Sequence, residues 1–341
     1  MGRPTIKDLA TAAGVSISTV NRVIGGGKVR HATMRRVRDA AAAIGFYGLG
    51  SIESRVGAAK AKHRFGMLLH QPHRTYYRML ADALVAAGDR FGGADVEIAV
   101  EFVDELTPQN IAGRMLALGG ACDAIGVVAA VHPLVARAID ALQGRGVPVF
   151  ALISELEAGG EVPYVGADNW KVGRTAGWAM HRLCKGPGKL GILVGNHRYR
   201  CQEQNESGFR SYLREFAPEF ALLEPLSTFE SSTVAQEVTE GLLREHPDLA
   251  GLFVAGGGIA GAMAALRSAG AAGRTVMVGH QLMDNTRAAL LDGTMSLAFS
   301  VSLDRLADLA VSGMARALDA GARGGGLGAV LPFEICTREN V

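Results

Sequence analysis

The feature that most constrains the fold is an alternation of short apolar runs and helix-length amphipathic segments that begins at Phe65. The expected strands are residues 65–70, 96–102, 122–129, 147–153, 189–195, 249–255 and 275–280. The expected helices are residues 74–90, 108–119, 132–145, 169–185, 203–216, 233–246, 259–269 and 284–292. Such alternation is typical of parallel sheets covered by helices on both faces. There are too many units for one compact sheet, so we expect two doubly wound α/β lobes.

Residues 1–64 differ from this body in charge. They hold 12 Lys and Arg but 3 Asp and Glu, giving +9, whereas the whole chain carries a formal charge of +2. The remainder is therefore mildly acidic. A basic segment joined to an acidic body indicates that the segment binds a polyanion, although a solubilising basic tail would have the same composition.

The cysteines and the N-terminus indicate where such a chain works. Cys122, Cys184, Cys201 and Cys336 are widely spaced and form no C-x-x-C pair, which argues against a disulfide framework or a zinc site. The N-terminus lacks the apolar region of a secretory signal, and no apolar run is long enough to span a membrane. We therefore expect a cytoplasmic protein with no bound metal and no membrane partner.

Residues 4–46 carry the start and stop signals of three helices. Thr5 and Ser16 are suited to cap the first two helices, and Gly14 suits the left-handed residue that ends the first. A third helix is expected from about His31 to Ile44. Two short helices joined by a glycine-containing turn have the outline of a helix-turn-helix.

The stretch TIKDLATAAGVSISTVNRVI, followed by KV and a helix that ends in IGF, resembles the DNA-binding head of the LacI/GalR (lactose-repressor) family nearly position by position. The family usually has serine where this chain has Asn21. The resemblance implies a regulator that binds double-stranded DNA. It implies a helix-turn-helix domain at 1–46, a hinge or linker at 47–64 and an effector-binding and dimerisation body at 65–341.

A recognition helix places its N-terminal side chains against base edges in the major groove. Ile17, Ser18 and Arg22 are the expected base-reading residues, and the resemblance places Ile17 and Ser18 at the family's specificity positions. Ile17 offers only apolar contact, as to a thymine methyl, whereas Arg22 can donate two hydrogen bonds to guanine. The expected phosphate contacts, which set register rather than sequence, are Thr5, Ser16, Thr19, Asn21 and His31.

The hinge pattern of the family, Pro-Asn followed by Ala-Arg-Ser-Leu, is weak in residues 47–64. Gly48 and Leu49 stand where Pro-Asn is expected, and Val56 or Ile52 is left as the apolar wedge for the minor groove. A flexible basic linker that contacts phosphates is the alternative.

The body resembles the family's periplasmic-binding-protein-like sensor less tightly, through PYVGADNWKVGRTAGWAMHRL, NESGFRSYL, TVMVGHQ and LPFEICTREN. The resemblance implies lobe 1 at about 65–163 plus 293–325, lobe 2 at about 164–292 plus 326–341, and a ligand cleft between them. No leucine-heptad tail follows, so we expect a homodimer that binds a pseudo-palindromic operator rather than a tetramer.

Gly256, Gly258 and Gly261 form a G-x-G-x-x-G pattern between an expected strand and an expected helix, the layout of a dinucleotide-binding turn. A nucleotide site also needs an acidic residue about 20 positions later to bind the ribose, but the next strand ends in Gly-His-Gln. We therefore expect no cofactor, and no catalytic signature such as G-x-S-x-G or H-E-x-x-H favours an enzyme. A nucleotide-binding enzyme fused to a DNA-binding head is the alternative hypothesis.

Three positions at which the family binds sugar hydroxyls are altered together. Ala255 and Gly256 replace Asn-Asp, Gln281 replaces an Asp, and Asn205 replaces an Arg. The glycine turn would then present bare backbone N–H groups that suit an anion. An acidic or phosphorylated sugar-like effector is therefore one hypothesis, and a body that no longer binds an effector is another.

Loops after the expected strands supply further candidates for the cleft. Tyr76 and Tyr77 can stack on a sugar ring, and the polar side chains can bind carboxylates, phosphates or hydroxyls. The expected effector-binding residues are His73, Tyr76, Tyr77, Asp168, Asn196, Arg198, Gln202, Glu203, Asn205, Gly256 and Gln281. By resemblance, the sequence thus predicts a repressor whose operator affinity responds to a sugar or sugar derivative.

Overall fold

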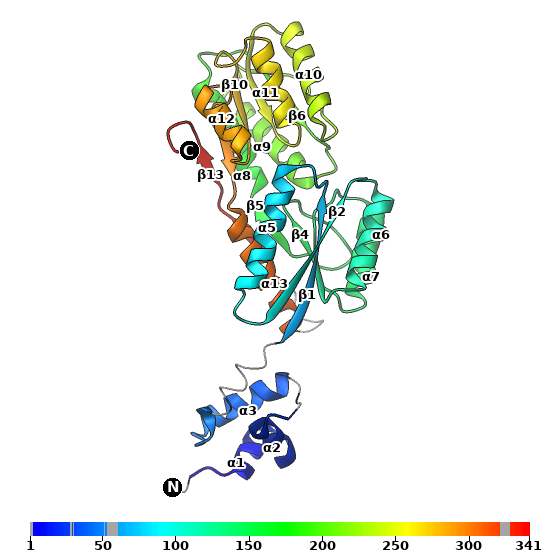
Figure 1. Cartoon of the computed structure of the whole chain (residues 1–341). Coiled ribbons are helices and arrows are strands. Elements are labelled where there is room, and N and C mark those ends of the chain that lie inside the picture. The colour runs from blue at the N-terminus through cyan, green and yellow to red at the C-terminus, as the bar shows by residue number, and fades with distance from the viewer. Residues whose placement is uncertain (1–2, 28, 30, 51, 53–60, 321–327) are drawn as a thin grey trace. The chain divides into compact units, whose positions relative to one another are not determined.

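The computed structural model describes residues 3–27, 29, 31–50, 52, 61–320 and 328–341 (Figure 1). The chain forms two compact units, which are described separately. The smaller unit is a helical head at the N-terminus, and the larger is an α/β body. Val56, the expected minor-groove wedge, lies outside the described residues, as does the side chain of His31.

The head consists of α1 (Ile6–Ala13), α2 (Ile17–Gly25) and α3 (His31–Ala43). The expected caps are confirmed, because the side chain of Thr5 accepts a hydrogen bond from the N–H of Asp8 and that of Ser16 accepts one from the N–H of Thr19. Gly14 ends α1 with a φ of 61°, the left-handed conformation that glycine adopts without strain. The predicted helix-turn-helix is therefore present.

A compact apolar cluster holds the head together. Leu9 from α1, Val20 and Val23 from α2 and Val37 from α3 are buried in it. Ile52 is also fully buried there, and its N–H donates to the carbonyl of Gly48 (3.2 Å). Ile52 is thus part of the core of the head in this structure and is not available as the minor-groove wedge.

The first sheet of the body forms lobe 1 and has the strand order β12-β5-β4-β3-β1-β2. Its strands are β1 (Lys62–His70), β2 (Asp95–Val103), β3 (Ala124–Val127), β4 (Val149–Leu152), β5 (Tyr164–Ala167) and β12 (Ala329–Leu331). Its helices are α5 (Thr75–Arg90), α6 (Pro108–Gly119), α7 (Pro133–Gln143) and α13 (Leu303–Ala320). Figure 1 shows α6 and α7 on one face of this sheet and α5 with α13 on the other.

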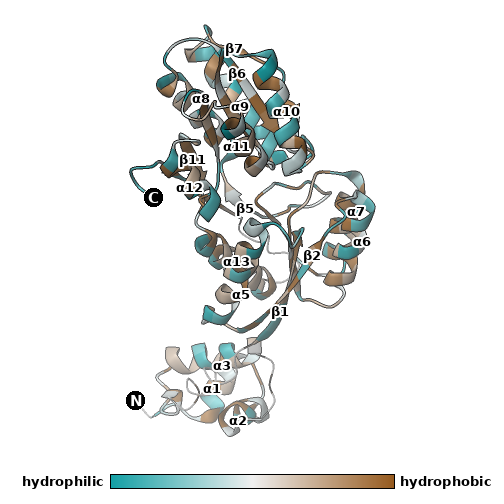
Figure 2. Cartoon of the chain, turned by 45° about the horizontal axis from the view of Figure 1, so that its top comes forward, coloured by the Kyte–Doolittle hydropathy of each residue, from teal (hydrophilic) through white to brown (hydrophobic). Residues whose placement is uncertain are grey.

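The second sheet forms lobe 2 and has the order β13-β11-β10-β9-β6-β7, with β8 paired to β6. Its strands are β6 (Lys189–Val194), β7 (Ala221–Leu222), β8 (Leu226–Ser227), β9 (Leu249–Val254), β10 (Val276–His280), β11 (Leu297–Ser300) and β13 (Glu334–Cys336). Its helices are α8 (Asn169–Leu183), α9 (Arg200–Phe216), α10 (Ser232–Glu245), α11 (Ile259–Ser268) and α12 (Asp284–Asp292). These helices turn apolar sides toward the sheet and polar sides away from it (Figure 2).

Both sheets repeat one doubly wound plan, as the alternation predicts. In lobe 1 the strand order places β1 between β2 and β3, and in lobe 2 it places β6 between β7 and β9. The direction of winding reverses beside β1 and beside β6. In such sheets ligands bind beyond the carboxyl ends of the strands at this switch point. The fold therefore directs attention to the loops after β1, β3, β6 and β9.

The chain crosses between the lobes after β5, after β11 and after β12, later each time than the sequence analysis expected. β5 pairs with β4 and β12 in lobe 1, whereas the sequence predicts that lobe 2 begins at about residue 164. β11 pairs with β10 in lobe 2, and β12 belongs to lobe 1, the reverse of the expected assignment. Strand pairing decides these boundaries, and it is not encoded in the local apolar pattern.

Candidate functional site

A cavity of about 750 Å³ lies between the two lobes of the body, at the switch points of both sheets. Lobe 1 contributes the segment after β1, including His73 and Tyr77, and Val128 after β3. Lobe 2 contributes the N-terminal part of α9 and the glycine turn 256–258 after β9. The expected cleft is therefore present where the topology places it.

Seven of the eleven residues predicted for the cleft line this cavity: His73, Tyr76, Tyr77, Gln202, Asn205, Gly256 and Gln281. The other four do not. Asp168 caps α8 and pairs with Lys171 (3.0 Å). Asn196 and Arg198 are exposed beyond β6, and Glu203 pairs with Arg200 (2.8 Å) on α9. Asp168, Asn196 and Glu203 thus satisfy local polar groups, and none of the four lines the cavity.

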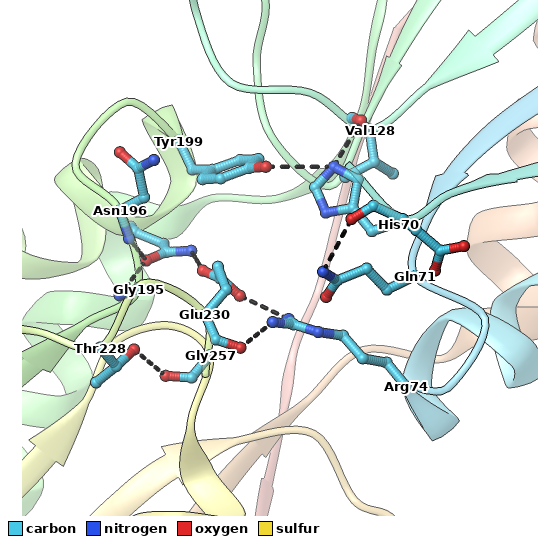
Figure 3. A network of polar contacts seen from close by, with 12 residues as sticks. His70, Gln71, Arg74, Val128, Gly195, Asn196, Tyr199, Thr228, Glu230 and Gly257 are labelled. Atoms are coloured by element: carbon cyan, nitrogen blue, oxygen red, sulfur yellow. Dashed lines mark hydrogen bonds and ion pairs between the residues drawn. The ribbon is translucent and has the colours of Figure 1, made fainter. Parts of the chain in front are cut away.

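An ion pair joins the two lobes at the cavity (Figure 3). Nη1 of Arg74, from the loop after β1, lies 2.7 Å from Oε2 of Glu230, from the loop between β8 and α10. Arg74 also donates to the backbone carbonyl of Glu230. The other carboxylate oxygen of Glu230 accepts from Nε2 of Gln202 (2.6 Å), whose own Oε1 accepts from the N–H of Gly195 (2.7 Å). This chain of contacts connects the segments after β1, β6 and β8.

Glycines make the room for this network. A Cβ at Gly195 or Gly257 would overlap the carboxylate of Glu230, and a Cβ at Gly256 would overlap the side chain of Gln202. Farther along, a Cβ at Gly261 would overlap the backbone of α10. The G-x-G-x-x-G run is therefore explained by internal packing. The carboxylate of Glu230 thus lies beside the turn whose N–H groups the sequence predicts to face an anionic ligand.

Left-handed backbone gathers at the same cavity. Four non-glycine residues in the described part of the chain have a positive φ: Ile153 (67°), Phe229 (51°), Glu230 (62°) and Gln281 (64°). All four line the cavity. Each such residue costs about 1 kcal/mol or more, and such residues cluster at ligand sites because the surrounding structure holds them there. The backbone strain is thus an observation, independent of the lining, that makes this cleft a candidate ligand site.

The buried His70, the half-buried His280 and the buried Asn205 supply uncharged polar groups. Nε2 of His70 lies 2.9 Å from the carbonyl of Val128 and 3.3 Å from the hydroxyl of Tyr199. Burial lowers the pKa of His70 and of His280 to about 4, so both rings are neutral at pH 7. Nδ2 of Asn205 donates to the carbonyl of Ala255 (3.2 Å), while its buried Oδ1 has no hydrogen-bond partner in the structure.

The cavity thus combines aromatic surfaces with hydrogen-bonding groups. The aromatic lining comes from Tyr76, Tyr77, Tyr199, Phe229, Phe299 and Phe333. A small polar molecule with apolar faces fits such a lining. Among the described residues no group of three or more His, Cys, Asp or Glu is placed to hold a metal ion.

Sequence reasoning missed Arg74 and Glu230 as a pair, as well as Phe299 as a lining residue. Arg74 lies just after the expected strand 65–70, so its place beyond a strand end was the available signal. Glu230 follows β8, a two-residue strand that the apolar pattern does not reveal. The position of Glu230 in the cleft depends on the left-handed backbone at Phe229 and Glu230, which these residue types do not predict.

The head presents one polar face of α2. Ile17, Ser18, Asn21 and Arg22 are exposed, with Ile17 retaining 47% of its accessible surface, while Val20 and Val23 face inward. Arg22 folds back on its helix, with Nε 3.4 Å from the carbonyl of Ser18. These are the side chains that the sequence predicted to read bases.

The capping residues of the head have internal partners. Thr5 binds the carboxylate of Asp8, and Ser16 contacts the hydroxyls of Ser18 (3.0 Å) and Thr19 (2.9 Å). Thr5, Ile17 and Asn21 also border a hollow of about 660 Å³ together with the exposed ring of Tyr47, a residue the sequence reasoning did not select. The predicted phosphate-contacting residues that the structure describes thus lie around the exposed start of α2.

Residues 65–322 match the periplasmic binding protein domain family, and residues 5–48 match the bacterial regulatory proteins of the lacI family. The chain belongs to the lacI family. The head is its DNA-binding domain, and the body is a periplasmic-binding-protein-like domain. The protein takes part in transcription regulation. In the described part of this lacI-family protein, no helix is long and apolar enough to cross a membrane.

The D-ribose/D-allose-binding protein of Pseudomonas aeruginosa is 30% identical over 133 residues, which are 39% of this chain and 41% of that protein. The chain thus matches less than half the length of this curated relative. Solved structures share the fold of the body at low identity. A solute-binding protein from Burkholderia graminis in complex with D-arabinose gives a TM-score of 0.75 at 19% identity, covering 82% of this chain and 97% of that one. One from Actinobacillus succinogenes with bound D-allose gives 0.73 at 18%, covering 81% and 98%.

Proposed function

We propose that this lacI-family protein binds a pseudo-palindromic operator as a homodimer, and that a sugar or sugar derivative in the cleft controls its affinity for the operator. The proposed sense of regulation is repression, which is the usual sense among the relatives that the head resembles. The protein acts as a binding protein and not as an enzyme.

One observation carries the proposal: a cavity large enough for a monosaccharide lies at both switch points, in a chain whose head exposes a recognition helix. Tyr76 and Tyr77 offer aromatic surface for a sugar ring, and Asn205, His280 and Gln281 offer uncharged hydrogen-bonding groups. The relatives support a sugar, because their names or bound ligands are D-ribose, D-allose and D-arabinose.

The coupling follows from linkage. An effector that binds one state of the body more tightly than the other shifts the population toward that state. Operator affinity then changes by the same coupling free energy, typically about 1–3 kcal/mol. On the DNA side, Arg22 and Ile17 are proposed to read bases, and Ser16 and Thr19 to contact phosphates.

The test combines DNA selection with a ligand panel. Selection from a random duplex library should enrich a palindrome, and neutral pentoses and hexoses should be screened by thermal shift, because a bound effector raises the stability of the folded state. The active sugar should then change operator binding in fluorescence anisotropy. Failure to enrich any sequence, or a sugar that binds without changing operator affinity, would contradict the proposal.

Two variants test whether the active sugar binds in the cavity. Asn205→Ala should abolish the thermal shift with the active sugar while leaving operator binding in its absence intact. Glu203→Ala is the matched control, because Glu203 lies on the same helix but outside the cavity. An Asn205→Ala variant that keeps the native thermal shift would show that the sugar binds elsewhere.

A further inference from the structure

The charges that line the cleft cancel one another. Among the described residues that line the cavity, Arg74 and Glu230 are the only Lys, Arg, Asp or Glu. Their side chains form the inter-lobe ion pair and retain 19% and 10% of their accessible surface. The guanidinium group is therefore already paired with a carboxylate of this chain, and the lining has no uncompensated Lys or Arg charge to offer an anion.

Glu230 is held in place from several directions. Gln202 donates to one carboxylate oxygen and Arg74 to the other, while Gly195 and Gly257 leave the space that the carboxylate fills. The left-handed φ of Glu230 directs its side chain into the cleft, and Arg74 also binds its backbone carbonyl. A carboxylate fixed in this way competes with a free anion at a high effective concentration.

The polar groups that remain for a ligand are uncharged. Oδ1 of Asn205 is buried in the cavity wall without a partner, and a hydroxyl is a donor that would satisfy it. His280 and Gln281 add neutral groups nearby. A ligand with several hydroxyls can satisfy these groups without disturbing the ion pair.

We propose that Glu230 determines the charge class of the ligand. Its carboxylate occupies the position at which an anionic group would bind Arg74 and the glycine turn, so the cleft accepts uncharged polyhydroxy molecules and excludes sugar acids and sugar phosphates. This inference rests on the proposed function in one respect only, namely that the cleft is the effector site. It replaces the hypothesis of an acidic or phosphorylated effector that the glycine turn suggested.

Removal of the negative charge at Glu230 should allow the cleft to bind anions. In Glu230→Gln the guanidinium of Arg74 would lose its counter-charge, and a partly buried cation without a partner favours any anion that can reach it. Phosphate and carboxylate groups match the guanidinium geometry with paired hydrogen bonds. The N-terminus of α11 lies at the same turn and adds a favourable dipole for an anion.

The experiment uses the full chain, Glu230→Gln, and Glu224→Gln as a matched control. Glu224 lies in the same lobe, and its side chain retains 95% of its accessible surface. Calorimetry and thermal shift are carried out with D-ribose, D-allose, D-ribose 5-phosphate and inorganic phosphate. Glu230→Gln should bind the two anions at least about tenfold more tightly than the native protein does, which is about 1.4 kcal/mol, and this gain should shrink as salt is added. Glu224→Gln should behave as the native protein.

Two results would overturn the inference: native protein that binds D-ribose 5-phosphate as tightly as the neutral sugars, or Glu230→Gln that matches Glu224→Gln toward phosphate. A gain of phosphate binding without any response to neutral sugars would support the role of Glu230 and count against the proposed effector class. If the native protein binds a neutral sugar but Glu230→Gln gains no phosphate binding, the result would support the proposed effector class and count against the role of Glu230. Glu230→Ala serves as a second variant should Glu230→Gln fail to fold.

Discussion

The ion pair between Arg74 and Glu230 should stabilise the body as well as select its ligand, and a double-mutant cycle measures how much. The cycle compares the native protein with Arg74→Gln, Glu230→Gln and the double variant. The separation is 2.7 Å, both side chains are largely shielded from water, and Glu230 also accepts from Gln202. A hydrogen bond to a charged group contributes about 1.5–3 kcal/mol net. We therefore expect a coupling energy of about 2 kcal/mol in the free energy of unfolding.

A second ion pair, which lies within lobe 2, provides the reference. Arg267 and Asp292 are joined at 2.8 Å, but their side chains retain 43% and 48% of their accessible surface. Exposed pairs of this kind contribute about 0.2–1 kcal/mol, because water and salt screen the charges and long side chains lose entropy. The two cycles thus differ in burial while the separation is nearly equal.

The assay is urea unfolding followed by tryptophan fluorescence. The chain has two tryptophans, Trp170 and Trp178, and both lie on α8, so the signal reports on the body. A coupling energy at the cleft no larger than that of the Arg267–Asp292 pair would refute the reasoning. It would mean that water reaches the cleft pair despite its burial, and that Glu230 is free to leave Arg74.

Three further outcomes are expected. Arg22→Ala should abolish discrimination between the operator and unrelated DNA while retaining much of the salt-dependent binding, measured by anisotropy on both duplexes; unchanged specificity would refute the assignment of the recognition helix. Gly261→Ala should lower the urea midpoint, because the added methyl overlaps the carbonyl of Ser232 and overpacking costs about 1–3 kcal/mol; an equally stable variant would disprove that contact. The unfolded chain binds protons at His70 and His280 below about pH 6.5, whereas the folded chain binds them only near pH 4. The free energy of unfolding should therefore decrease as the pH is lowered from about 6.5 to about 4, and it should be retained above pH 6.5. His280→Gln should flatten this dependence in melting experiments, and a profile identical to that of the native protein would contradict it.

Local signals explain what the sequence could predict. Thr5, Gly14 and Ser16 set the ends of the first two helices through contacts with residues at most a few positions away, so the head follows from its sequence. In the body the apolar pattern predicts β1, β2, β3, β4, β6, β9 and β10 and the helices α5 to α12, but it does not reveal the strands β5, β7, β8, β11, β12 and β13 or the helix α13. The ends of the predicted strands indicate seven of the residues that line the cavity.

Contacts between distant segments explain what was missed. The lobe to which β5, β11 or β12 belongs depends on which strand it pairs with, and an apolar run of a few residues fits either sheet. The contact between Arg74 and Glu230 joins positions 156 residues apart and depends on a strained turn. The sequence could not show whether the glycines after β9 bind a ligand or allow close packing, because the residues beside them, such as Gln202 and Glu230, come from other elements.

The three crossings between the lobes have a consequence for synthesis. One edge strand of each sheet is made after all the other strands of that sheet: β12 completes lobe 1, and β13 completes lobe 2. The head and the inner strands of both lobes can therefore form before these two edge strands are available. Until β12 emerges, the backbone of β5 has an unpaired edge, which is a site for aggregation. A chain that stops before β12 would thus retain the DNA-binding head but carry a body with an open sheet.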